Sequence, residues 1–151
     1  MILPYLRWVS KKSSDFQIPP IIFDYTDMEN KYNADDPKHL AEFLTGKSEY
    51  TLMLFDHFIN EFQKIGPVTI HPAKSMIGIA NSHKRVVYIT ALGKNFIHVV
   101  FPFKEPHADN LCFQKIAQVP GDMQFNHHFR MLQKEDLNEE VIEFMRLAYN
   151  S

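Results

Sequence analysis

The chain has 151 residues, a formal net charge of -2 at pH 7 and a pI near 6.4. Hydrophobic residues make up 45% and charged residues 23% of it, close to the average for folded globular proteins, which argues against a disordered or fibrous protein. This length suits one domain with one core. The slight negative charge argues against a protein that grips nucleic acid through many phosphate contacts.

Cys112 is the only cysteine of the sequence, so no internal disulfide and no multi-cysteine zinc site can form. The N-terminal residues do not show the basic segment followed by an apolar stretch that is typical of a secretory signal peptide. No uninterrupted apolar run approaches the roughly 20 residues that span a bilayer. We therefore expect a cytoplasmic protein that is neither secreted nor inserted into a membrane.

Residues 1–47 are rich in prolines and polar turns, and we expect them to form an irregular N-terminal extension packed on or beside the domain. Inside it, Ile21-Ile22-Phe23 is a candidate edge strand. Asp36, followed by Pro37 and by apolar residues up to Gly46, predicts a short helix with an Asp cap.

Residues 48–151 are expected to form a single domain that begins and ends with a helix. Ser48 is a candidate cap for a helix to about Ile65, because apolar residues recur there at steps of three and four. Asp136, with Glu139 three residues later, predicts the cap of the last helix. Between the helices the hydrophobic period is two, which predicts strands over residues 68–71, 76–80, 85–92, 96–101, 113–119 and 124–132.

The short turns between these strands can join only antiparallel neighbours. The predicted fold is therefore α+β, an antiparallel sheet of five or six strands with two flanking helices. The segments 86–91 and 96–101 carry apolar residues at both alternating sets of positions. Apolar side chains on both faces imply that both faces are covered, and the N-terminal extension or a second copy of the protein could supply that cover.

From about residue 43 to 150 the chain resembles a bacterial domain-of-unknown-function family loosely labelled "predicted transport protein". The resemblance is carried by an ordered set of short segments: Phe43-Leu44-Thr45-Gly46-Lys47, Gly66-Pro67-Val68, Pro72-Ala73-Lys74-Ser75, Phe113-Gln114-Lys115-Ile116, Asn126-His127-His128-Phe129-Arg130-Met131, Asp136-Leu137-Asn138-Glu139-Glu140 and Ala148-Tyr149.

The resemblance implies a compact domain that stands alone or is joined behind nuclease-like modules, and it implies no established activity. The transport label finds no support in a sequence without a membrane span. Many stand-alone relatives look as if they begin with a small cysteine-containing metal-binding ribbon, which is absent here because no cysteine precedes position 112. The first 40 residues are therefore a different attachment.

His127 and His128 are the most suggestive pair for chemistry, since imidazole titrates near neutral pH. On a strand their side chains point to opposite faces, so the two cannot easily act on one substrate. The pattern predicts a buried, hydrogen-bonded His127 on the core face. His128 and Arg130 then share the other face.

Lys74, Lys115, His128 and Arg130 are the candidate ligand-binding residues. If they converge, they form a small site for a phosphate or carboxylate, because cations around an anion make charge-assisted hydrogen bonds. The alternative is a set of solvated side chains at strand ends. The sequence does not decide whether the four residues meet.

His83, Lys84 and Arg85 form a short basic turn and are weak candidates for contact with nucleic acid; the alternative is a turn whose charges only keep it hydrated. No pair of histidines has the spacing of a helical metal motif, and we predict no metal site. Cys112 is more typical of packing than of a nucleophile. No glycine-rich phosphate loop or nucleophile elbow occurs, so we predict no catalytic set and no cofactor.

Three functional hypotheses follow, and the balance favours a role without catalysis. The first is a non-enzymatic binding or protein-interaction module, as a homodimer or on another protein. The second is a domain that recognises a small anionic ligand, phosphate or nucleotide-like, through Lys74, Lys115, His128 and Arg130. The third, an accessory domain for nucleic acid, ranks last because of the net charge.

Overall fold

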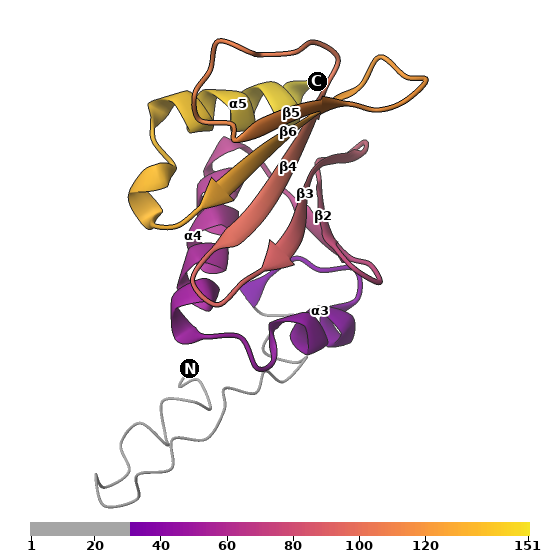
Figure 1. Cartoon of the computed structure of the whole chain (residues 1–151). Helices are drawn as coiled ribbons and strands as arrows, with labels where there is room; N and C mark the ends of the chain where they lie inside the picture. Colours follow the sequence, from indigo (N-terminus) through magenta and orange to yellow (C-terminus); the bar gives the residue numbers. More distant parts are fainter. Residues whose placement is uncertain (1–30) are drawn as a thin grey trace, which may run out of the picture.

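The structure is a computed structural model and describes residues 31–151 (Figure 1). The candidate strand Ile21–Phe23 lies outside these residues. No helix within the described range is long and apolar enough to cross a membrane. The elements are α3 (Pro37–Leu44), α4 (Glu49–Ile65), β1 (Thr69–Pro72), β2 (Ile77–Ala80), β3 (Arg85–Leu92), β4 (Ile97–Phe103), β5 (Lys115–Gln118), β6 (Phe125–Met131), the 3-10 turn η2 (Lys134–Asp136) and α5 (Glu139–Asn150).

The strands form one six-stranded antiparallel sheet in the order β1-β2-β3-β4-β6-β5. Helices α4 and α5 lie on the same side of this sheet, and α3 lies near its β1 end (Figure 1). The predicted α+β class, with an antiparallel sheet and two flanking helices, is confirmed. All six predicted strands agree with β1 to β6 to within two residues at each end.

Helix α4 supplies the largest side chains of the core. Its apolar residues recur at steps of three and four, and Phe55, Phe58 and Phe62 are fully buried against the sheet. Each such burial removes enough apolar surface to contribute roughly 1.5–3 kcal/mol. The helix ends at Gly66, where a Cβ would lie 2.5 Å from the ring of Tyr149. The glycine thus allows α5 to pack closely against the end of α4.

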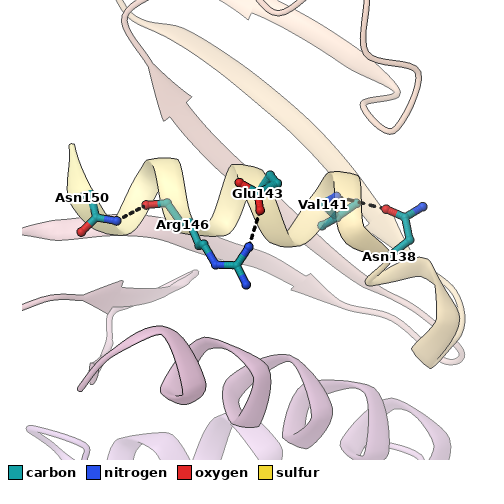
Figure 2. A network of polar contacts seen from close by, with 5 residues as sticks. All are labelled: Asn138, Val141, Glu143, Arg146 and Asn150. Atoms are coloured by element: carbon teal, nitrogen blue, oxygen red, sulfur yellow. Dashed lines mark hydrogen bonds and ion pairs between the residues drawn. The ribbon is translucent and has the colours of Figure 1, made fainter.

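Helix α5 begins two residues later than the sequence indicates. The predicted cap, Asp136, is wrong: Asn138 caps the helix, and its side chain accepts a hydrogen bond from the Val141 amide at 3.0 Å (Figure 2). Asp136 instead closes the turn η2, where its carboxylate accepts hydrogen bonds from the amides of Leu132 and Gln133. Both residues are good cap formers, so only the path of the chain out of β6 distinguishes them.

Two register shifts explain much of the two-sided apolar pattern of β3. Ile79 pairs with Val87 while Ala80 pairs with Arg85, so Val86 is an additional residue in the ladder. Val86 and Val87 are consequently both buried in the same core, at 2% and 0% exposure. A further shift follows Ile89 on the same strand. Part of the apolar pattern therefore reflects bulges, which reduces the need for a covering partner.

Helix α3 begins at the predicted cap, since Asp36 accepts a hydrogen bond from the His39 amide. Leu40 and Leu44 are fully buried in the same core as α4, and Tyr32 joins them at 4% exposure. The Tyr32 hydroxyl donates to Asp56 on α4 at 2.7 Å. Residues before position 47 therefore contribute to the core, while a domain boundary at that position stays a prediction.

A buried hydroxyl joins the start of α4 to the β3–β4 turn. Thr51 is fully buried, and its Oγ1 donates to the Gly93 carbonyl and accepts from the Ser48 hydroxyl. Ser48 Oγ also lies 2.5 Å from the Lys94 carbonyl oxygen, so its one hydroxyl proton is shared between this carbonyl and Thr51 Oγ1.

Thr51→Val keeps the shape of the side chain and leaves the Gly93 carbonyl without its donor. We expect the free energy of unfolding to fall by about 1–3 kcal/mol, the cost of an unsatisfied buried polar group, measured by urea denaturation. Thr45→Val is the matched control, because Thr45 is exposed and its hydroxyl bonds the Ala41 carbonyl of its own helix. A loss for Thr51→Val no larger than for Thr45→Val would contradict the structural role.

Candidate functional site

The pairing of β4 with β6 separates two sets of side chains at the centre of the sheet. Phe101 faces His127 and Val99 faces Phe129 on the helix-covered face, where all four are buried. The alternate residues occupy the other face, which no helix among residues 31–151 covers. We call this surface the open face; around its centre lie His98, Val100, Pro102, Lys115, Asn126, His128 and Arg130.

His127 belongs to the core, as the sequence predicts. It is fully buried, and its Nε2 accepts a hydrogen bond from the His107 amide at 3.1 Å. Its Nδ1 lies 2.9 Å from the Phe125 carbonyl and must be the protonated nitrogen, since a carbonyl only accepts. The rings of Phe103 and Phe113 pack edge-on against it. Both nitrogens are satisfied, so His127 is a neutral structural residue.

His128 points to the open face and meets His98. His98 Nε2 and His128 Nδ1 are 3.0 Å apart, so one ring donates a proton to the lone pair of the other. His98 Nδ1 and His128 Nε2 are left for other partners. Both side chains are half-buried, which makes the pair accessible without being fully hydrated.

Two cations flank this histidine pair. Lys115 on β5 is directly opposite His128 in the register, and Arg130 on β6 is directly opposite His98. The Arg130 guanidinium lies 4.5 Å from the centre of the Phe96 ring, a cation–π contact that restrains its position. Neither Lys115 nor Arg130 forms an ion pair with a carboxylate in the part of the chain that the structure describes. Their charges are available to a ligand.

The surroundings hold both histidines in the neutral form near neutral pH. Burial, and then the positive charge of Lys115, lower the pKa of His128. Burial, followed by His128 and Arg130, lowers the pKa of His98. An anion bound here would offset the neighbouring charges and favour protonation, which would add N–H donors to the site.

Three of the four predicted ligand residues thus come together, and one does not. Lys115, His128 and Arg130 lie on neighbouring strands of the open face, but Lys74 is in the turn between β1 and β2. Four strand spacings separate β2 from β5, about 19 Å at 4.8 Å each. Sequence reasoning missed His98, although its position opposite Arg130 would follow from the correct β4–β6 register.

The basic turn is part of a different region. His83 and Lys84 lie in the turn between β2 and β3, and Arg85 begins β3. This turn is at the end of the sheet where β4 finishes, and its possible contact with nucleic acid stays a prediction.

Cys112 does not have the properties of a nucleophile. Burial, and then the neighbouring Glu140 carboxylate, raise the pKa of its thiol to about 11. The thiol is therefore protonated near neutral pH, and the thiolate is the reactive form. Residues 31–151 contain no group of three or more His, Cys, Asp or Glu side chains arranged to hold a metal ion.

The part of the chain that forms this fold matches a known protein family. The family model "Domain of unknown function (DUF5655)" matches residues 40–151. The chain belongs to the DUF5655 family. No curated protein and no solved structure matches it. The match begins within α3, in agreement with the burial of that helix in the core, and it assigns no reaction or ligand to the domain.

The buried histidine makes stability depend on pH. Burial is the main cause that lowers the pKa of His127. The hydrogen bond to the Phe125 carbonyl raises this pKa and opposes burial, and the His107 charge lowers it further. The unfolded chain then binds more protons than the folded chain below pH about 6.5. We expect the free energy of unfolding to fall as the pH drops below this value, by about 1.4 kcal/mol per unit of pKa depression.

Urea denaturation at a series of pH values from about 8 to about 5 measures this effect, because that range spans the ordinary histidine pKa. His127→Gln should reduce the pH dependence even though it lowers stability overall. His83→Asn, at an exposed position, is the control and should leave the dependence unchanged. An identical pH profile for His127→Gln and the unaltered protein would disprove the assignment.

Proposed function

We propose that this DUF5655 domain recognises a small anionic ligand, carrying a phosphate or carboxylate group, at the centre of its open face. The observation that carries the proposal is the meeting of His98, His128, Lys115 and Arg130 on one surface with no carboxylate partner for either cation among residues 31–151. Charged donors on neighbouring strands bind an oxyanion through short, charge-assisted hydrogen bonds.

The site is arranged in advance of binding. The Phe96 ring holds Arg130 and packs so closely on Gly93 that a Cβ there would lie 2.2 Å from a ring carbon. The histidine pair is held by the paired backbones of β4 and β6. Side chains that are already restrained lose less entropy when a ligand binds.

Recognition without catalysis is the simpler function for this geometry. Two imidazoles could transfer protons, but the nitrogens that face each other are 3.0 Å apart and bond to each other. No space for a reacting atom lies between them. The free nitrogens and the two cations instead offer donors to an anion.

Protein interaction, the first hypothesis from the sequence, remains a second candidate. It rests on the absence of a helix over the open face within the described residues and on exposed apolar residues such as Leu111, which is 93% exposed. The centre of the open face favours an anion over an apolar partner, because Val100 is already buried to 7% exposure without one and lies beside His98 and His128. A homodimer and a nucleic-acid partner also remain untested proposals.

Arg130→Gln should weaken binding of sulfate to the full chain by about tenfold or more, because a hydrogen bond to a charged group contributes roughly 1.5–3 kcal/mol. Isothermal titration calorimetry measures the affinity. Arg146→Gln is the matched control, since Arg146 lies on α5, across the sheet from the open face, where it pairs with Glu143 (Figure 2). Equal sulfate affinities of both variants and the unaltered protein would disprove anion binding at this site.

The pH profile gives an independent check of the same site. Sulfate keeps its charge near neutral pH, so a change in affinity reports the protein's own groups. Since the pKa values of His98 and His128 are lowered, we expect affinity to rise as the pH falls and the pair gains a proton. Affinity that is independent of pH in the unaltered protein would exclude the histidines from binding.

A further inference from the structure

A hollow of about 420 Å³ lies at the end of the sheet where β3 begins and β4 finishes. Small-molecule sites are usually roughly 300–1,000 Å³ in volume. Five separate segments line the hollow: the β2–β3 turn, strand β3, the end of β4 with the loop after it, the residue before β6, and α5 with the residue after it. Six of the lining residues supply its cations, rings and apolar surface: Lys84, Arg85, Tyr88, Phe103, Lys104 and Leu147.

One part of the hollow is apolar and aromatic. Phe103 is 5% exposed and forms part of the core, and its ring packs edge-on against that of His107 at 5.2 Å. Leu147 on α5 is 46% exposed, so it offers an apolar surface to solvent at this place. Tyr88 pairs with Val100, so its ring lies on the open-face side of the sheet, opposite Phe103 and Leu147. A flat, apolar group on either side of the sheet end would remove part of this surface from water.

The other part of the hollow is cationic. Lys84, Arg85 and Lys104 line it, with Glu105 as the one carboxylate side chain among the lining residues, so these side chains sum to +2 (three positive, one negative) in a chain of net charge -2. None of the three cations forms an ion pair within the described part of the chain. Positive charge is therefore concentrated beside the apolar surface.

The cationic part is held in place by the β2–β3 turn. The Asn81 side chain accepts hydrogen bonds from the amides of His83 and Lys84 at 2.8 and 2.9 Å. Its Nδ2 also donates to the Tyr149 carbonyl at 2.8 Å, which fixes the turn to α5. This arrangement is an Asx turn, in which one side chain organises the following backbone. The turn brings Lys84 and Arg85 to the hollow at little entropic cost.

Gly78 determines where Arg85 lies. A Cβ at position 78 would be 2.9 Å from Arg85 Cδ, so the arginine stem runs directly over the glycine. The backbone at position 78 does not require glycine, because Gly78 does not have the left-handed φ that Gly46 and Gly121 adopt. The absence of a side chain here lets Arg85 lie flat against the sheet and reach the hollow.

We propose that this hollow is a second binding site and that it takes a nucleotide: the base packs on the ring and apolar groups, and the phosphate binds Lys84, Arg85 and Lys104. An apolar wall beside three cations matches a ligand with a flat ring at one end and a phosphate at the other. The hollow adjoins the open face at Pro102, but its three cations differ from the two beside the histidine pair. Tyr88 is two strand spacings from His128, about 10 Å.

Titration calorimetry of the full chain with AMP, GMP, CMP and UMP, each beside its nucleoside, and with inorganic phosphate tests this assignment. At least one nucleotide should bind ten times more tightly than both its nucleoside and phosphate alone, because only the nucleotide uses both parts of the hollow. Binding of none of them, or equal binding of a nucleotide and inorganic phosphate, would overturn the proposal.

Variants locate the binding. Lys84→Ala combined with Lys104→Ala should weaken nucleotide binding at least tenfold, and Gly78→Ala should weaken it by displacing Arg85 with no change of charge. Arg130→Gln should leave it unchanged, so failure here and failure of the site at the open face are distinguishable. Loss of nucleotide binding in Arg130→Gln but not in the lysine variant would overturn the proposal. Binding of single-stranded RNA without binding of any mononucleotide would also overturn the proposal, because it would favour a surface for nucleic acid.

Discussion

The antiparallel pairing of β4 with β6 is the constraint on which the rest of the structure depends. Seven consecutive positions pair, from Ile97 with Met131 to Phe103 with Phe125. A slip of one residue would move every side chain of a strand to the opposite face. The aromatic core, the buried His127 and the half-buried His128 of the open face therefore share one cause, the register of these two strands.

The two adjacent histidines show how strongly a local environment separates identical side chains. His127 has a backbone donor for one nitrogen, a carbonyl acceptor for the other and aromatic rings around it. His128 has another histidine as its partner and Lys115 opposite it. The first arrangement satisfies every polar atom and stabilises the fold. The second leaves nitrogens and charges for a ligand, which is why the open face is the better candidate for function.

The distribution of charge matters more for this domain than its sum. The net charge of -2 disfavours a broad nucleic-acid surface. It does not prevent small concentrations of positive charge, and the structure contains two of them, around the histidine pair and around the hollow beside Arg85. Each adjoins aromatic or imidazole groups. Both arrangements suit small anions better than long polyanions, because a few cations can surround one phosphate but cannot follow a backbone.

The sequence by itself determined the class of the fold, the strands, the cap and core face of α4 and the burial of His127, because these follow from periodicity and from short-range hydrogen bonds. It did not determine the cap of α5, since Asp136 and Asn138 are both suitable and the path of the chain after β6 decides between them. The pairing of His98 with His128, the separation of Lys74 from Lys115 and the hollow lined by Lys84, Arg85 and Lys104 depend on strand order and register. These are contacts between residues far apart in the chain, and only the tertiary structure decides them.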